Sequence, residues 1–323
     1  MADASSAGPD YADVHEKLKN FLTDFEEEDA DGQPAKKYLA LLQKVANRKE
    51  RQVHIDLDNV YEALDEELGD QMKANAKRYQ RLFADAIDEV MPAPTFADAE
   101  DEDAADILLR SRMQRSAAGD GDSNDPAQQV PPSLKRRYEV LLMPRVKEKA
   151  RALRKVRADA IGQLLTVKGI VTRVSEVKPS IAVAVYTCAK GGFEVYQEVQ
   201  SRSFMPLFAC PASNCCQNGR LNLQTRGCKF VKFQEVKIQE EADEVPVGHV
   251  PRQLTVHLYG ELTRGCSAGD VVTVSGIFLP VPYAGFKAMK AGLITDTYLE
   301  AQHVEKHKKS YVLTLSPHPS PSS

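Results

Sequence analysis

The sequence contains no tryptophan and no apolar run long enough to cross a membrane. Its aromatic residues are 11 tyrosines and 11 phenylalanines. A membrane-spanning helix needs about 18 or more consecutive apolar residues, and no such run occurs. Residues 1–10 are small and acidic and lack the basic and apolar regions of a secretory signal. We therefore expect a protein of the nucleus or cytosol that has no membrane partner.

Cysteine is scarce, and the common catalytic motifs are missing. Six cysteines in a chain without a secretory signal favour metal binding or simple burial over a disulfide framework. The sequence has no G-x-x-x-x-G-K-[ST] phosphate loop, no G-x-S-x-G turn and no H-E-x-x-H helix. It therefore offers no ATP site and no catalytic residues, and we expect the chain as given neither to hydrolyse ATP nor to unwind DNA.

The net charge of -4 is divided unevenly along the chain. Residues 1–130 carry a net charge of -15, and residues 131–323 carry +11. A polyanion would be attracted to the second part and repelled by the first. Acidic helices are also common on soluble proteins, so the charge pattern indicates a nucleic-acid partner only together with other features.

The acidic part predicts a helical domain over residues 1–91. Apolar residues recur at helical spacing in three stretches, around Leu18, around Leu42 and from about Gln71 to Val90. Alternation at Val53, Ile55 and Leu57 predicts a short strand. The prolines after Met91 end the last helix. Residues 92–133, rich in Ala, Asp, Ser, Gly and Pro, are predicted to be a mobile linker with a helical patch near 107–115.

The basic part predicts several short strands with turns between them. β-Branched residues dominate from Val156 onward, in the segments 165–167, 170–172, 181–185, 254–258 and 271–274. About five strands with a long interruption are typical of an OB-fold barrel carrying an insert, although composition also allows a sandwich. We predict an α+β protein, with an OB-fold domain over 134–310 that contains a ribbon-like insert at about 186–227.

The interruption contains four of the six cysteines. Paired cysteines about 15–20 residues apart are typical of a zinc ribbon, in which four thiolates form a tetrahedral cage. The sequence supplies Cys188, Cys210, Cys215 and Cys216, but Gly191 stands where the first pair needs its second cysteine. Zinc held by these thiolates is one interpretation, and a ribbon that buries its cysteines without metal is the other. Cys228 and Cys266 are isolated, and we predict that they are packed or partly exposed thiols rather than metal ligands.

Long segments of the basic part resemble the minichromosome maintenance (MCM) family of DNA replication licensing factors. The resemblance is carried by residues 156–179, by the segment from Phe230 to Arg252 and by Gly269–Pro280. Over 134–310 the similarity is close, and over 11–91 it is looser. It is stronger to one of the six subunits of the eukaryotic hexamer than to its siblings. In the family an AAA+ ATPase domain follows, whereas residues 311–323 here form a proline- and serine-rich tail unlike the family.

The resemblance implies a fold of three parts: a helical bundle, a zinc ribbon and an OB-fold. It further implies that six sibling subunits form a ring around DNA and that two rings meet through their ribbons. The family acts in the nucleus, so the resemblance implies a nuclear protein. The segment from Phe233 to Arg252 is similar to the loop that transmits movements of the ATPase domain. The missing cysteine at position 191 would weaken zinc binding by the ribbon and any contact between rings that depends on the ribbon.

Basic residues near the predicted strands are candidates for binding single- and double-stranded DNA. The proline-rich segment after Leu279 predicts a projecting hairpin that carries Lys287 and Lys290, and the family places a basic hairpin in its central channel. Arg173, Lys178 and Arg226 are further candidates. Such contacts neutralise phosphates without reading sequence and weaken with salt. OB-folds also stack bases on aromatic rings, a task that falls here to Phe or Tyr.

Two other functions remain open at this point. An autonomous single-strand-binding OB-fold protein would bind DNA as a monomer, whereas a ring subunit would associate with its siblings. A metal-dependent hydrolase would use Cys188, Cys210 and Cys215, because a three-ligand zinc site with water can be catalytic. The insert lacks the His-x-Glu pattern of the zinc deaminases.

Overall fold

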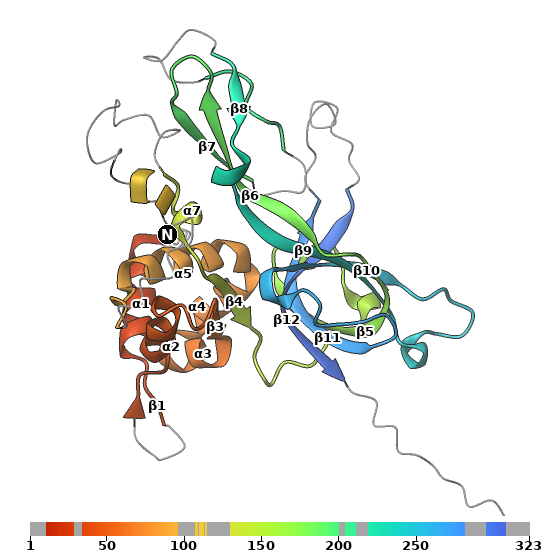
Figure 1. Cartoon of the computed structure of the whole chain (residues 1–323). Helices are drawn as coiled ribbons and strands as arrows, with labels where there is room; N and C mark the ends of the chain where they lie inside the picture. The colour runs from red at the N-terminus through yellow and green to blue at the C-terminus, as the bar shows by residue number, and fades with distance from the viewer. Residues whose placement is uncertain are drawn as a thin grey trace, which may run out of the picture.

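The structure is a computed structural model of the chain, and its described parts form three units. It describes residues 11–28, 34–95, 107–108, 110–112, 114, 130–199, 204–210, 219–281 and 295–307. A helical unit packs beside a β-barrel, and an insert projects from the barrel on two long strands (Figure 1). The protein therefore has the α+β composition that the sequence predicts. None of the described helices is long and apolar enough to span a membrane.

The helical unit contains five α-helices around one apolar core. Its elements are α1 (Tyr11–Asp24), the short strands β1 (Glu27–Glu28) and β2 (Pro34–Ala35), α2 (Lys37–Ala46), β3 (Gln52–Asp56), α3 (Leu57–Ala63), α4 (Glu66–Ala74) and α5 (Ala76–Val90). The rings of Phe21, Tyr38 and Phe83 meet at its centre, with centroids 4.9 and 6.5 Å from Phe21. The helix predicted from about Gln71 is wrong in its start, because α4 and α5 are separate helices that join at Asn75.

One strand from beyond the predicted linker completes the helical unit. The strand β4 (Glu139–Met143) pairs in parallel with β3, so that Val140 lies opposite Val53. The short helix α7 (Pro132–Lys135) precedes it. Residues 139–143 therefore pack with the helices, although the sequence predicts that they belong to the OB-fold domain. Their apolar side chains Val140 and Leu142 belong to the core of the helical unit.

Five strands close into a barrel. They are β5 (Leu164–Val174), β9 (Lys229–Gln239), β10 (Gln253–Tyr259), β11 (Val271–Pro280) and β12 (Thr297–His307). The pairings run β5–β9–β10–β12–β11 and back to β5, and only the β10–β12 pair among them is parallel. This ring of pairings excludes the two-sheet sandwich that composition allowed. Short 3-10 helices lie beside the strands: η1 (Leu153–Lys155), η2 (Ala158–Ala160), η3 (Thr225–Gly227), η4 (Ala242–Glu244) and η5 (Gly260–Leu262).

The segments predicted as two strands, 165–167 and 170–172, form the single strand β5. Gly169 lies inside it, where a Cβ atom would stand 2.7 Å from the carbonyl oxygen of Gln239 on β9. A glycine within a strand often marks such a close approach of two backbones. Gly169 is therefore a packing requirement of the barrel wall and not a turn between two strands.

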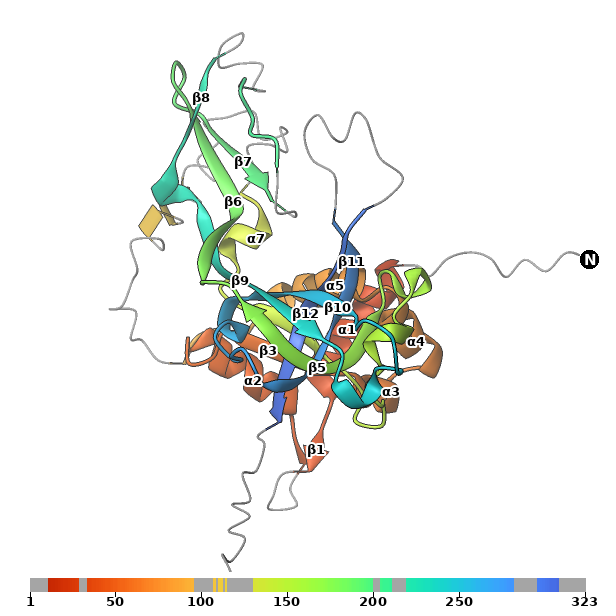
Figure 2. The ribbon, with the colours of Figure 1, turned by 90° about the vertical axis from the view of Figure 1, so that its right-hand side faces the viewer.

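The insert is a small antiparallel sheet with its own core. The strand β6 (Lys178–Cys188) lies between β7 (Glu194–Glu198) and β8 (Leu221–Leu223). Its first half pairs with β9, so β6 and β9 run continuously from the barrel into the insert (Figure 2). The core buries Ala184, Tyr186, Cys188, Val195, Cys210 and Leu221.

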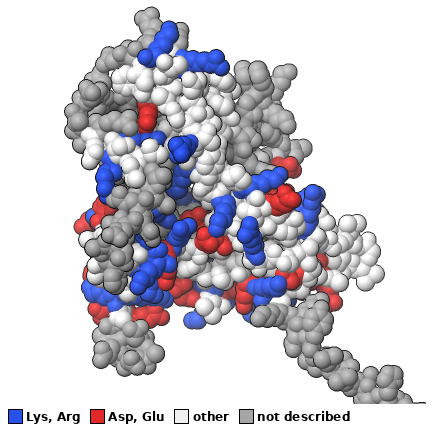
Figure 3. All heavy atoms as spheres, in the orientation of Figure 1, with Lys and Arg blue, Asp and Glu red and all other residues white. Residues whose placement is uncertain are grey.

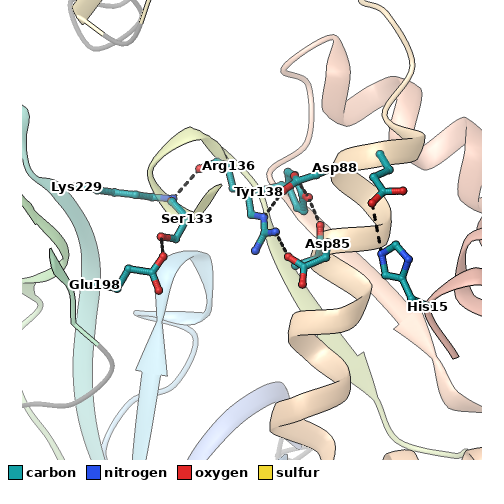
Figure 4. Close-up of polar contacts among 10 residues, drawn as sticks. His15, Asp85, Asp88, Ser133, Arg136, Tyr138, Glu198 and Lys229 are labelled. Atoms are coloured by element: carbon teal, nitrogen blue, oxygen red, sulfur yellow. Dashed lines mark hydrogen bonds and ion pairs between the residues drawn. The ribbon is translucent and has the colours of Figure 1, made fainter. Parts of the chain in front are cut away.

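Polar contacts fasten the three units together where they meet. Lys77 Nζ lies 2.5 Å from Glu300 Oε1, and Gln80 Nε2 donates to Gln302 Oε1 at 3.2 Å, which joins α5 to β12. Lys229 of β9 donates to the carbonyl oxygens of Ser133 and Arg136 at 2.8 and 2.6 Å. Figure 4 shows its side chain extending toward this segment. Burial lowers the pKa of Lys229. The insert is thereby tied to the chain that leads into β4.

Candidate nucleic-acid interface

Two predicted DNA-binding residues lie on the outer face of the barrel along β9. Arg173 of β5 stands directly opposite Lys237 of β9, next to an irregularity in the β5–β9 register. Val236 and Ile238, on either side of Lys237, are buried in the barrel core, so Lys237 faces outward. Like charges directly opposite one another destabilise a sheet. An anion between Arg173 and Lys237 would remove that repulsion.

A row of one basic and two aromatic residues crosses the same face. Lys178 of β6 lies opposite Phe233 of β9, which lies opposite Tyr259 of β10. Directly opposed residues of antiparallel strands project from the same side of the sheet. The rings of Phe233 and Tyr259 are 5.3 Å apart between centroids. The row combines a cation for a phosphate with rings on which bases can stack.

The ring contacts continue from this row toward β12 through the buried side chain of His257. The ring of His257 lies 5.2 Å from Phe233 and stacks on Tyr298 at 4.1 Å. Burial raises the pKa of Tyr298 to about 12, so its hydroxyl stays protonated at neutral pH. Sequence reasoning missed Phe233, Tyr259 and Lys237. The alternation of Phe233, Glu235 and Lys237 with buried residues along β9 was the available signal.

Arg226 lies apart from the other basic residues, at the base of the insert. It is exposed on η3, just before β9 begins, whereas Arg173 pairs near the end of β9. The three described candidates are thus spread along β9, whose 11 residues span about 36 Å at roughly 3.3 Å per residue. A single DNA strand that contacts all three basic residues would have to follow the length of β9.

Basic and acidic side chains are not evenly mixed over the surface. In Figure 3, lysine and arginine gather where the helical unit meets the insert, and others are scattered over the barrel. Acidic side chains occur among them in this view (Figure 3). One of the basic residues of β9, Lys232, pairs with Glu261 at 3.1 Å. This face of the molecule is therefore suited to a DNA strand that is bound by individual lysine and arginine side chains rather than by a uniformly positive surface.

The predicted basic hairpin lies outside the described residues, but its two ends are described. Lys287 and Lys290 belong to the segment 282–294, which connects β11 to β12. Pro280 pairs with Thr297, and the amide of Val281 donates to the carbonyl of Asp296 at 2.8 Å. The segment therefore joins two neighbouring antiparallel strands, as a hairpin requires.

The structure brings two of the four predicted metal ligands into one core. Cys188 ends β6 and Cys210 precedes β8, and both are buried in the insert. Gly191 lies in the turn between β6 and β7 and offers no ligand. Cys215 and Cys216 lie outside the described residues. Within the described part of the chain, no three potential ligands come together.

Of the two isolated cysteines, Cys228 is partly buried and Cys266 is buried, in agreement with the prediction of packed or partly exposed thiols. The Cys228 thiol contacts the carbonyl of Gln224 at 3.2 Å and the amide of Val185 at 3.3 Å. Cys266 is buried in the barrel, and burial raises the pKa of its thiol. A protonated, buried thiol is a weak nucleophile and a poor metal ligand.

The segment from Phe233 to Arg252 is partly strand and partly loop. It completes β9, passes through η4 and reaches the start of β10. Arg154 donates to both carboxylate oxygens of Glu240 where the loop leaves β9, at 3.0 Å from Nε to Oε1 and 3.0 Å from Nη2 to Oε2. The loop tip exposes Val247 and Val250. The loop is therefore anchored at its base and free of packing at its tip.

Comparison with known proteins finds two matching families. Residues 15–139 match the MCM N-terminal domain, and residues 152–282 match the MCM OB domain. Over 316 residues, 96% of this chain, the sequence is 51% identical to the DNA replication licensing factor MCM7 of Oryza sativa subsp. indica. It is 41% identical to mcm7 of Schizosaccharomyces pombe over 326 residues, and 35% identical to mcm6 of that organism over 130 residues. The chain spans 43% and 42% of the two MCM7 relatives.

Proposed function

The chain belongs to the minichromosome maintenance family as an N-terminal portion of a replication licensing factor subunit, and from this premise we propose that it binds DNA through the outer face of its barrel. The observation that carries the proposal is the arrangement along β9. Arg173 and Lys237 form one basic pair, and Lys178, Phe233 and Tyr259 form a row beside it. Cations that bind phosphates and rings that stack bases thus share one face.

A salt titration with labelled oligothymidylate tests this proposal. The full chain should bind single-stranded DNA weakly, with an affinity that falls steeply between low and physiological salt. The double variant Arg173→Ala/Lys178→Ala should reduce the slope of log affinity against log salt by about 1.4, at roughly 0.7 per phosphate contact. Lys190→Ala, in the exposed turn of the insert, is the control and should leave the slope unchanged. Binding that does not depend on salt would contradict the proposal.

The segment between β11 and β12 supplies the second proposed contact. Lys287 and Lys290 would reach phosphates of a single or double strand that passes the open end of the barrel, next to Pro280 and Thr297. Lys287→Ala/Lys290→Ala should weaken binding to both forms of DNA and leave the melting temperature unchanged. Equal DNA affinity of this variant and the parent chain would show that the segment is not part of the interface. Arg226→Ala, at the base of the insert, tests in the same way whether bound DNA extends that far.

We propose that this interface binds DNA within a ring of sibling subunits in the nucleus. Its relatives are named as replication licensing factors, and part of this chain is similar to a second such subunit. ATP-dependent unwinding is proposed for the assembled whole protein. An autonomous single-strand-binding module is the alternative, since the barrel face alone could hold a strand. Co-expression with sibling subunits separates the two: a ring subunit co-purifies with them, whereas an autonomous binder remains a monomer with full DNA affinity.

Zinc is the proposed cofactor of the insert. Cys188 and Cys210 share a core, which fits two ligands of one site, and the chain supplies Cys215 and Cys216 for the remaining two. Zinc would stabilise the insert by holding its turns together. Metal analysis of the purified chain should give about one zinc per molecule, and less after Cys210→Ser. A metal-free parent chain with a folded insert would favour cysteines that are merely buried.

A further inference from the structure

The chain between β4 and β5 contains a dense run of positive charge. Residues 145–157 include seven lysines and arginines and one glutamate. In Figure 1 the yellow-green chain that joins β4 to β5 runs on the side of the molecule away from the insert. Runs of like charge are most often solvated surface. Because like charges repel one another, the run costs stability unless carboxylates or an anionic ligand neutralise it.

The carboxylates beside this basic segment are already paired with other cations. The pairs are Glu148 with Lys73 at 2.8 Å, Glu240 with Arg154 at 3.0 Å, Glu241 with Lys168 at 3.2 Å and Asp58 with Arg145 at 3.3 Å. Just beyond the segment, Asp159 adds one exposed carboxylate. The segment therefore keeps a surplus of positive charge.

Four side chains of the segment carry this surplus. They are the exposed residues Lys147, Lys149, Lys155 and Arg157. In the part of the chain that the structure describes, none of the four makes an ion pair or a side-chain hydrogen bond. Their charges are therefore available to a ligand.

The backbone that carries these cations is held against the barrel. Leu153 and Ala160 are buried in the barrel core. The amide of Arg151 donates to the carbonyl of Thr166 on β5 at 2.8 Å. A segment that is ordered before it binds loses less conformational entropy on binding than a mobile tail does. The segment is thus a preformed surface for a polyanion.

The basic segment lies at the end of the β9 face. Arg154 donates to Glu240, the residue that follows β9. Glu240 is three positions beyond Lys237, and three residues of a strand span about 10 Å. Lys237 stands opposite Arg173 in the basic pair of that face. The cations of the segment therefore begin close to the place where the β9 face ends.

We propose that a single DNA strand bound along β9 continues past this basic pair onto the segment, where Lys149, Lys155 and Arg157 contact its phosphates. This inference rests on the proposed function. The segment has no aromatic residue and so offers no ring for base stacking. Its contribution is therefore independent of base sequence and decreases as salt increases.

Oligothymidylates of two lengths test the proposal with the full chain. One of about 6 nucleotides lies within the range of a single OB-fold site, and one of about 20 nucleotides exceeds it. The triple variant Lys149→Ala/Lys155→Ala/Arg157→Ala should bind the short oligonucleotide as the parent chain does. For the long oligonucleotide it should reduce the slope of log affinity against log salt by about 2.1, at roughly 0.7 per phosphate contact.

A second triple variant controls for the loss of charge. Lys19→Ala/Lys36→Ala/Lys44→Ala removes the same charge from the helical unit, where each of these lysines lies near a carboxylate. It should leave the salt slope unchanged for both oligonucleotides. The melting temperature of the first triple variant should equal that of the parent chain, because its three substituted side chains are exposed.

Two results would overturn the proposal. If the long oligonucleotide binds the first triple variant and the parent chain equally, the segment is not part of the DNA interface, and an acidic protein partner becomes the alternative. If both lengths lose affinity equally, the cations attract DNA without continuing the strand bound along β9. Neither result affects the proposed function, which fails if Arg173→Ala/Lys178→Ala leaves binding of the short oligonucleotide unchanged.

Discussion

The side chains of the β9 face differ in the kind of contact that they offer to DNA. Phe233 offers a ring for stacking, and Arg173 offers a charge. Base stacking is worth about 1–3 kcal/mol per base and releases no counterions. We therefore expect Phe233→Leu to lower affinity by about that amount at every salt concentration, with an unchanged salt slope. Arg173→Ala should reduce the slope instead.

Fluorescence anisotropy at four salt concentrations distinguishes the two effects. Phe230→Leu, an exposed aromatic residue near the start of β9, serves as the control for Phe233→Leu. Two variants with the same salt slope would show that the face does not divide its contacts in this way.

His54 gives the fold a dependence on pH. Its pKa is lowered because burial disfavours the charged ring and because His303 lies nearby. The unfolded chain, in which histidine titrates near about 6.5, therefore binds the proton better than the folded chain does. Stability is full above about pH 6.5 and decreases as the pH falls below it, until the folded ring also becomes protonated.

Thermal unfolding in phosphate-free buffers checks this expectation. The melting temperature should fall between pH 7.5 and pH 5.5, and His54→Asn should reduce that fall. His249→Asn, at an exposed site in the β9–β10 loop, should not. An equally steep pH dependence in the His54 variant would assign the effect to other groups.

At the scale of the strands, glycines determine how closely the barrel wall can pack. A Cβ atom on Gly276 would stand 2.4 Å from the carbonyl oxygen of Glu300, beside the irregularity in the β11–β12 register. The two strands are held together by backbone hydrogen bonds, so they can separate to make room for the Cβ atom only at a cost in free energy. We expect Gly276→Ala to lower the free energy of unfolding by about 1–3 kcal/mol. Gly265→Ala, whose nearest neighbour would be 3.3 Å away, should cost less in the same denaturant titration.

Elements with a strong local pattern were predictable, and elements defined by distant partners were not. The apolar stripe of α5 and the β-branched runs of β5, β10 and β11 predicted their structure from sequence alone. The pairing of β4 with β3 was not foreseen, because the two strands are more than 80 residues apart. Nothing local distinguishes a strand that returns to an earlier unit from one that begins the next.

The candidate site was predictable in its charges but not in its aromatic residues. Arg173 and Lys178 stood out as cations beside predicted strands. Phe233 and Tyr259 are 26 residues apart in sequence and become neighbours only through the β9–β10 register.

At the scale of the whole molecule, Arg112 fastens the segment between the two domains to the insert. Its side chain is buried, and Nε lies 2.8 Å from a carboxylate oxygen of Glu194 on β7. A Cβ atom on Gly227 would stand 2.5 Å from Nη2 of Arg112, so this glycine makes room for the guanidinium. Arg112→Ala leaves Glu194 without this partner and opens a gap at the base of the insert.

We expect Arg112→Ala to increase hydrogen exchange in β7 and η3 while the barrel strands stay protected. Ile107→Ala, an exposed residue of the same segment, is the control and should leave the exchange unchanged. Uniformly faster exchange across the barrel would mean that Arg112 supports the entire fold rather than the insert.

The position of β12, the strand that closes the barrel between β10 and β11, has a consequence for synthesis on the ribosome. The strand β12, at residues 297–307, lies between β10 and β11 and joins them in the ring. Until it has emerged, the edges of β10 and β11 remain exposed and the cylinder stays open, however early the helices have folded. Vectorial translation therefore produces a nascent chain with two unsatisfied strand edges, which are prone to aggregation. A ribosome-bound chaperone that shields strand edges would be needed most during the last stretch before that strand appears.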